Sequence, residues 1–259
     1  MAHASELPAA ASPLPLPASL WLEAEVAGVA ANLALDEALL EEAHEGVLTA
    51  PVVRTWMATQ PVVVVGSSSR IDEEVDRAAC AARGVGIVRR PSGGATVVLG
   101  PGCLMWTVVS PFPQGVPPLE QIHAGMLEPL CAALARPGIE VARYGTSDLV
   151  LVSAGEARKI SGNALRVRRQ GVLYHGTLLD DVDIDLVGSL LKHPPREPAY
   201  RARRPHAAFL ANLHLGRPLL EQAVRRAFAA ELSRGDWPET RMERLLRDRY
   251  AAADWTDRL

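Results

Sequence analysis

The stretch RKISGNALRVRRQGVLYHGTLL, residues 158–179, predicts two strands joined by a turn at Gly171. The segments 141–144 and 148–153, just before it, predict two further short strands in the same region. Neighbouring strands without long helices between them are typical of a mixed or antiparallel sheet rather than of a β-α-β array.

The rest of the chain adds strands and helices in irregular order. The β-branched run PVVVVG (61–66) predicts a buried strand, and Gly-Pro-Gly (100–102) predicts a turn between two others. Further strands are predicted at 51–56, 85–90, 96–99 and 104–109, and helices within 21–45 and at 72–83, 119–135, 222–232 and 239–250. The fold class that follows is α+β, with a mixed, largely antiparallel sheet flanked by helices.

The composition limits the classes of protein to consider. The 259 residues carry a formal charge of −3, which does not indicate a nucleic-acid-binding surface. No apolar run reaches the roughly 20 residues needed to cross a bilayer, so we expect no membrane association. Cys80, Cys103 and Cys131 have neither metal-ligand spacing nor a paired framework, which suits a reducing cytoplasm. The Ala- and Pro-rich residues 1–20 predict a disordered tail before one domain, residues 21–259.

Three segments carry possible chemistry, and each has a plainer interpretation. RRPSGGAT (89–96) is either an anion-binding glycine loop or a turn with a solvated arginine pair. Lys159 in RKISGNA either reaches an anionic oxygen or is an exposed lysine on a hairpin. His175 in HGTLL either transfers protons or is structural.

The order of these segments resembles the lipoate–protein ligase A and octanoyltransferase family, whose catalytic domain is shared with biotin–protein ligases. RRPSGGA, TSDL (146–149), RKISGNA and HGTLL carry the resemblance, with looser matches in NLALDEALLE (32–41) and VVVVGSSSR (62–70). It spans residues 21–228 and implies a fold like that of class II aminoacyl-tRNA synthetases and biotin ligases. It also implies an enzyme that attaches lipoate or octanoate to a lysine of a lipoyl carrier domain through an acyl-adenylate.

The resemblance also implies roles for individual residues. Lys159 corresponds to the invariant family lysine, which binds the acyl carboxylate and the adenylate phosphate, where charge of this kind stabilises a transition state. Asp148 would orient Lys159 or a metal ion. The residues expected to bind substrate or nucleotide are Arg90, Ser92, Gly93, Gly94, Ala95, Thr96, Val97, Val98, Ser147, Asp148, Gly162, His175, Gly176 and Thr177. The implied cofactors and substrates are ATP, Mg²⁺ and lipoate, and no resident metal is expected.

The sequence departs from the family pattern in several places. Ala95, Leu99 and Gly100 stand where the family has a third glycine and a His-Asp pair, and the usual Gln-Asn after Gly66 is missing. We expect no C-terminal accessory domain within this chain; a separate protein supplies that domain to some family ligases. The transferase branches of the family use a nucleophilic cysteine, yet residues 139–148 and the segment after HGTLL contain none. Cys103 is the one cysteine we consider as a nucleophile.

These departures leave two alternatives to the ligase. One is an octanoyl or lipoyl transferase that needs no ATP, and the other is an acyl-binding homologue without catalysis. The expected partners are the lipoyl domains of 2-oxoacid dehydrogenases or the glycine cleavage H protein. The chain contains only two lysines, and Lys192, outside the motifs, is predicted to be a surface residue whose replacement is silent.

Overall fold

The computed structural model describes residues 17–24, 26–136 and 138–259 and contains two sheets. The large sheet has eight strands in the order β11-β1-β2-β6-β10-β9-β8-β7, and the small sheet has the order β4-β3-β5. Strand β1 pairs in parallel with both β2 and β11, while every other pair in the large sheet is antiparallel. The predicted α+β class with a mixed, largely antiparallel sheet is therefore confirmed.

The strand boundaries agree closely with the sequence patterns in the centre of the chain. The strands are β1 (Leu20–Leu22), β2 (Val52–Met57), β3 (Val62–Val65), β4 (Gly86–Arg89), β5 (Val97–Leu99), β6 (Cys103–Pro111), β7 (Glu140–Tyr144), β8 (Asp148–Ser153), β9 (Glu156–Arg168), β10 (Gly171–Leu179) and β11 (Leu232–Arg234).

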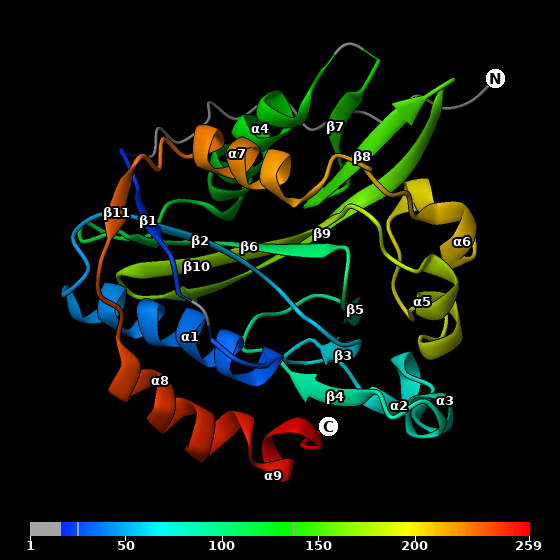
Figure 1. The fold of residues 1–259 in the computed structure, drawn as a ribbon, viewed down its shortest axis with the longest axis horizontal. Helices are drawn as coiled ribbons and strands as arrows, with labels where there is room; N and C mark the ends of the chain where they lie inside the picture. Colours follow the sequence, from blue (N-terminus) through cyan, green and yellow to red (C-terminus); the bar gives the residue numbers. More distant parts are fainter. Residues whose placement is uncertain (1–16, 25, 137) are drawn as a thin grey trace.

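The helices cover both faces of the large sheet (Figure 1). They are α1 (Val29–Glu45), α2 (Ile71–Glu74), α3 (Arg77–Ala82), α4 (Leu119–Leu134), α5 (Ile184–Leu190), the 3₁₀-helix η1 (Ala199–Arg201), α6 (His206–Phe209), α7 (Arg217–Ala227), α8 (Glu239–Leu245), the π-helix η2 (Leu246–Tyr250) and α9 (Ala253–Thr256). Helices α4 and α7 lie on one face of the sheet, whereas α1, backed by α8, lies on the other.

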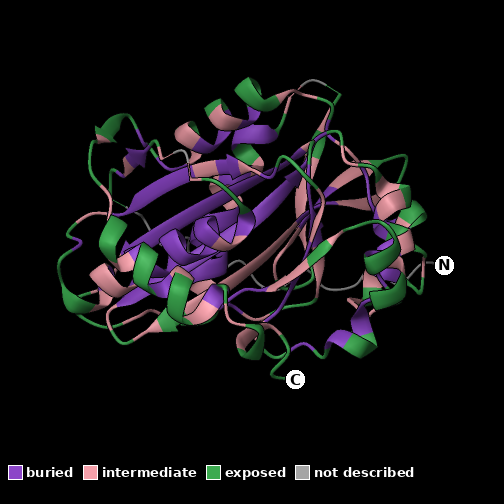
Figure 2. Cartoon of the chain, turned by 60° about the horizontal axis from the view of Figure 1, so that its bottom comes forward, coloured by how far each residue is buried: buried purple, intermediate pink, exposed green. Residues whose placement is uncertain are grey.

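Alternation along the central strands divides the core between these two faces. In β6, Leu104, Trp106 and Val108 pack toward α4 and α7, while Met105 and Val109 pack toward α1. This is the period of two that a strand requires when both of its faces are buried. Buried residues accordingly occupy the central strands and the inner sides of the helices in Figure 2.

The structure corrects three predicted boundaries. The predicted helix 72–83 is interrupted because Val75 is extended, and Asp76 caps a new helix by accepting a hydrogen bond from the Ala79 amide at 2.8 Å. The predicted helix 222–232 ends at Ala227, and Leu232 begins β11. Residues 1–16 of the predicted tail lie outside the described residues, but Leu20 already belongs to β1.

Within the described part of the chain, no helix is long and apolar enough to cross a membrane.

Candidate functional site

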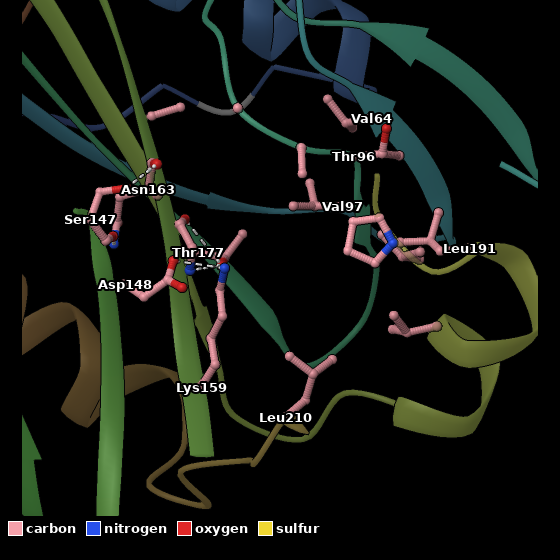
Figure 3. A pocket seen from close by; sticks show the side chains of 18 of the residues that line it. Val64, Thr96, Val97, Ser147, Asp148, Lys159, Asn163, Thr177, Leu191 and Leu210 are labelled. Carbon is pink, nitrogen blue, oxygen red and sulfur yellow. Dashed lines mark hydrogen bonds and ion pairs between the residues drawn. The ribbon is translucent and has the colours of Figure 1, made fainter. Parts of the chain in front are cut away.

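A cavity of about 450 Å³ opens between the two sheets and a segment on the far side, residues 184–210, which we call the wall segment. Polar side chains cluster at one end, which we call the polar end, and mostly apolar side chains, together with Glu74 and Lys192, line the rest. Figure 3 shows Asp148, Lys159 and Thr177 gathered at the polar end, with Val64 and Leu191 across the cavity. This combination of a long apolar lining with a few convergent polar groups is typical of a small-molecule site.

Lys159 is held at the polar end by an ion pair. Its Nζ lies 2.7 Å from Oδ1 of Asp148, with side-chain exposures of 23% and 14%, so the pair is sheltered yet open to a ligand. Asp148 Oδ2 accepts a second hydrogen bond, at 2.8 Å, from the hydroxyl of Tyr200. The alternative that Lys159 is an exposed lysine on a hairpin is therefore wrong.

An irregularity in β9 turns Lys159 toward this cavity. Lys159 pairs with Val150, Ser161 pairs with Leu149, and Ile160 is the extra residue of a β-bulge between them. Without the bulge, Lys159 and Gly162, three residues apart, would face opposite sides of the sheet. With it, both lie on the face of Asp148.

Gly162 leaves the space that the lysine side chain fills. A Cβ at this position would lie 3.0 Å from both Cε and Nζ of Lys159. The amide of Gly162 donates to the Thr177 hydroxyl at 3.1 Å, which ties this point of β9 to β10. The spacing of lysine and glycine in RKISGNA thus has a direct steric reason.

The SGG loop is braced by Arg90, whose guanidinium is buried. Arg90 donates to the carbonyls of Val64, Gly93 and Ala95 and to the hydroxyl of Ser92, at 2.6–3.2 Å. Burial lowers the pKa of Arg90 to about 10, although it remains a cation at neutral pH. Among the described residues no carboxylate forms an ion pair with Arg90, although the negative charge of Glu74 raises its pKa from a greater distance.

Arg89 does not act together with Arg90, although the two residues are adjacent in the sequence. It is fully buried, and its guanidinium donates to the carbonyls of Gly66, Ser69 and Thr256. The two arginines are therefore not a solvated pair, and they do not form one bidentate anion site. Each braces a different set of loops, and Arg89 links the loop after β3 to α9.

His175 belongs to a buried polar chain beneath the SGG loop. Its Nε2 lies 2.6 Å from the Ser92 hydroxyl, and its Nδ1 lies 3.6 Å from Oδ2 of Asp36. The Ser92 hydroxyl thus accepts a hydrogen bond from Arg90 Nε and shares another with His175 Nε2, while Nδ1 of His175 faces Asp36 without a hydrogen bond. Burial would raise the pKa of Asp36, but Arg54 and His175 outweigh it and hold that pKa below its ordinary value.

The series Ser92–His175–Asp36 resembles a Ser-His-Asp relay in its order of contacts. Ser92, however, is only 1% exposed and does not line the cavity. His175 does reach the cavity wall. The arrangement therefore fixes the shape of the loop rather than presenting a serine to a ligand.

The structure brings most of the predicted site residues together. The predicted residues that line the cavity are Arg90, Gly94, Ala95, Thr96, Val97, Val98, Ser147, Asp148, Lys159, Gly162, His175, Gly176 and Thr177. Ser92 and Gly93 lie behind this surface. Ser147 and Asn163 exchange two hydrogen bonds, Ser147 Oγ to Asn163 O at 3.1 Å and Asn163 Nδ2 to Ser147 O at 2.7 Å.

Several lining residues were not predicted from the sequence. Asn163 stands within RKISGNA and could have been found there, whereas Glu74 and the wall segment carried no motif. Lys192 is exposed, as predicted, but it also lines the cavity, and its Nζ donates to the Asp72 carbonyl at 2.7 Å. Because Lys192 lines the cavity, we do not expect its replacement to be silent.

The cysteines lie away from the cavity lining. Cys103 is fully buried at the start of β6, and burial raises the pKa of its thiol to about 12. Burial also raises the pKa of Cys80 and of Cys131, the latter to about 12. A thiol acts as a nucleophile through its thiolate, so these environments disfavour that chemistry.

Charge along the cavity favours an anionic ligand. Lys159, Lys192, Arg90, Arg196 and Arg201 face it against three carboxylates, those of Glu74, Asp148 and Glu197. The described residues contain no group of three or more His, Cys, Asp or Glu side chains that could hold a metal ion. If a nucleotide carried a Mg²⁺ ion into the polar end, the carboxylate nearest to Lys159 would be that of Asp148. The ion and Lys159 would then compete for this carboxylate.

The architecture and the cavity together define an α+β protein with a small-molecule pocket, and comparison places it more narrowly. The family model for the lipoyl protein ligase A/B catalytic domain matches residues 29–233, and the chain belongs to that family. A solved structure of a bi-partite lipoate protein ligase and its E2 lipoyl domain from Thermoplasma acidophilum has the same fold. Its TM-score is 0.79 at 23% identity, with 93% of this chain and 96% of that chain covered.

Several relatives from different bacteria carry the name octanoyltransferase LipM. The one from Moorella thermoacetica is 29% identical over 94% of this chain and 100% of its own length. The one from Symbiobacterium thermophilum is 34% identical over 78% of this chain and 81% of its own length.

Proposed function

We propose that this protein transfers an octanoyl or lipoyl group to a lysine of a lipoyl carrier domain. The observation that carries the proposal is the cavity itself, in which the sheltered ammonium of Lys159 stands beside an extensive apolar lining. An acyl chain would occupy the apolar part and place its carbonyl oxygen beside Lys159. The names of the relatives support octanoyl transfer.

Lys159 has the main electrostatic role in this proposal. When the acceptor amine attacks the acyl carbon, negative charge develops on the carbonyl oxygen, and a preorganised ammonium stabilises that charge. The buried cation of Arg90 adds positive potential behind the SGG loop. Leu99, which replaces a polar family position, is buried in the lining and lengthens the apolar part of the cavity.

We further propose that the acceptor amine attacks the activated acyl group directly, without an acyl-cysteine intermediate. The three cysteines, all within the described residues, lie outside the lining, and their raised pKa values disfavour thiolates. The donor that we propose is an octanoyl thioester on a carrier protein, since the names of the relatives specify octanoyl transfer. The lysine amine forms an amide bond to the acyl carbon, the C–S bond breaks, and the proton lost by the amine leaves with the carrier thiol.

The second candidate is the ATP-dependent ligase, in which lipoate or octanoate is first converted to an acyl-adenylate. The excess of positive charge around the cavity favours it, because an adenylate phosphate needs cationic partners. In that case Lys159 and Arg90 would face the phosphate, and ATP brings its own Mg²⁺.

One assay separates the candidates. The protein is incubated with an apo lipoyl domain and either octanoyl carrier protein without ATP, or octanoate or lipoate with ATP and Mg²⁺. The ATP arm is run with and without a separate accessory-domain protein, and the mass of the lipoyl domain is measured. Modification in the thioester arm supports the main proposal, and modification only with ATP supports the ligase. If neither arm modifies the domain while the purified protein still binds octanoate, the non-catalytic alternative applies.

A further inference from the structure

Tyr200 lies just behind the cavity lining, in the wall segment, and its side chain is hydrogen-bonded to the ion pair at the polar end. Its hydroxyl donates to Oδ2 of Asp148, whose Oδ1 is bound to Lys159. We infer that Tyr200 positions the Asp148–Lys159 pair for acyl transfer, which makes the wall segment part of the transfer machinery. This inference rests on the proposed function and adds a residue to it.

The carboxylate of Asp148 lies between two donors at nearly equal distances, 2.7 Å from Lys159 Nζ and 2.8 Å from the Tyr200 hydroxyl oxygen. Burial raises the pKa of Tyr200, and the negative charge of Asp148 raises it further. The phenol therefore stays protonated and acts only as a donor to Asp148.

A second donor changes how tightly the carboxylate holds the ammonium. Asp148 takes one of the three N–H donors of Lys159, and an oxygen that gains charge in the cavity draws the same ammonium toward itself. The hydrogen bond from Tyr200 satisfies part of the charge on Asp148. Lys159 therefore remains oriented by the carboxylate but can turn toward the acyl oxygen.

Tyr200 is itself fixed on several sides. Its ring contacts Tyr144 of β7 edge-on, with centroids 5.3 Å apart, and Phe209 of α6 at 5.2 Å. The guanidinium of Arg201 lies 4.7 Å from the centroid of Phe209 and closes this cluster. Such packing preorganises the hydroxyl, which is what a positioning residue requires.

The wall segment is also tied to Lys159 through the backbone. The Ala211 amide donates to the Lys159 carbonyl at 2.9 Å, just past the end of the segment. In the first half of the segment, the Lys192 amide donates to the Glu74 carbonyl at 2.9 Å. The segment thus spans the cavity from β9 to α2, with Tyr200 between these two attachments.

The test compares Tyr200→Phe with the matched control Tyr144→Phe. Both changes remove one hydroxyl from the same aromatic contact, and only the hydroxyl of Tyr200 is bonded to the Asp148–Lys159 pair. We expect Tyr200→Phe to lower kcat about 10-fold with little change in KM for the carrier domain, as for loss of one hydrogen bond to a charged group. Tyr144→Phe should stay within about 2-fold of the wild type in both constants.

A direct measurement on Lys159 makes the result independent of activity. Because the chain has only two lysines, ¹³Cε-lysine labelling gives two side-chain signals, and Lys192→Arg assigns them. Tyr200→Phe should shift the Lys159 signal, and Tyr144→Phe should leave it in place. An unshifted signal, or an unchanged kcat, in a folded Tyr200→Phe protein overturns the inference.

The two proposals fail in different ways. If the wild type transfers no acyl group from any donor, the proposed function fails, and the labelled lysine alone decides whether Tyr200 acts on Lys159. If the wild type is active, two results reject the role of Tyr200 while the proposed function stands. In one, Tyr200→Phe lowers both KM and kcat; in the other, it changes neither constant.

Discussion

A Cβ on Gly162 would lie 3.0 Å from Nζ of Lys159, because the bulge at Ile160 places both residues on one face of β9. The glycine is therefore required by the position of the ammonium rather than by its own backbone conformation.

Gly162→Ala should lower transfer activity while preserving the fold. The added methyl meets the flexible end of a side chain, so the ammonium moves and the backbone stays. The ammonium has to move by a few tenths of an ångström, and a shift of this size should lower the rate by about 10-fold. Steady-state kinetics measure the effect, with Gly86→Ala as the control, since no atom lies within 4 Å of the Cβ position there. Equal losses in both variants would contradict the steric explanation.

Lys159→Ala should reduce kcat by about 100-fold or more, as removal of a preorganised charge does elsewhere. Lys159→Arg should not restore activity, because a planar guanidinium cannot replace a compact ammonium in the space beside Gly162. Circular dichroism and thermal unfolding should show both variants folded. An arginine variant with full activity would show that any cation suffices.

Cys103→Ala should keep transfer activity within about 3-fold and lower the free energy of unfolding by about 1–3 kcal/mol, through the small cavity it leaves. Kinetics with an octanoyl donor and chemical denaturation measure the two effects. Detection of an octanoyl thioester on Cys103 by mass spectrometry, together with loss of activity in the variant, would establish the cysteine mechanism instead.

His206 predicts a dependence of stability on pH. Burial lowers its pKa to about 4, and the charges of Arg201, His193 and Lys159 act in the same direction. An unfolded histidine titrates near 6.5, so between pH 6.5 and about 4 the unfolded chain binds the proton and the folded chain does not. The free energy of unfolding should therefore fall as the pH falls through this window.

Urea unfolding at several pH values should show a smaller decrease for His206→Asn than for the wild type. His214→Asn, at a position whose side chain is 67% exposed, provides the comparison. An identical pH profile for the wild type and His206→Asn would rule out His206 as the source.

The sequence predicts those parts of the site that belong to continuous strands. Alternation and β-branched runs locate β3, β6 and β10. RKISGNA and HGTLL meet at the cavity because β9 and β10 are adjacent in the large sheet, whereas RRPSGGAT reaches it from the small sheet. The bulge at Ile160 is not predictable in this way, since no residue in RKISGNA distinguishes a regular strand from a bulged one.

Contacts between distant segments escape sequence reasoning for a different reason. Tyr200 lies 52 residues from Asp148 in an irregular segment without periodicity, so only the folded chain shows that they meet. The parallel pairing of β1 with β11 likewise joins two three-residue strands from opposite ends of the chain. Arg89 and Arg90 are adjacent, yet their side chains reach different loops, which the pattern of charges cannot reveal.

The engagement of both lysines has a consequence for the chemical fate of the protein itself. A molecule that handles activated acyl groups exposes its own amines to them, and stable amides would accumulate on any free lysine near the cavity. This chain has two lysine side chains, and both face the cavity with the ammonium already bonded, Lys159 to Asp148 and Lys192 to the Asp72 carbonyl. Its other side-chain cations at neutral pH are arginines, whose guanidinium groups stay protonated and do not attack acyl donors. If it transfers acyl groups as proposed, the protein should therefore remain almost free of self-acylation through many turnovers.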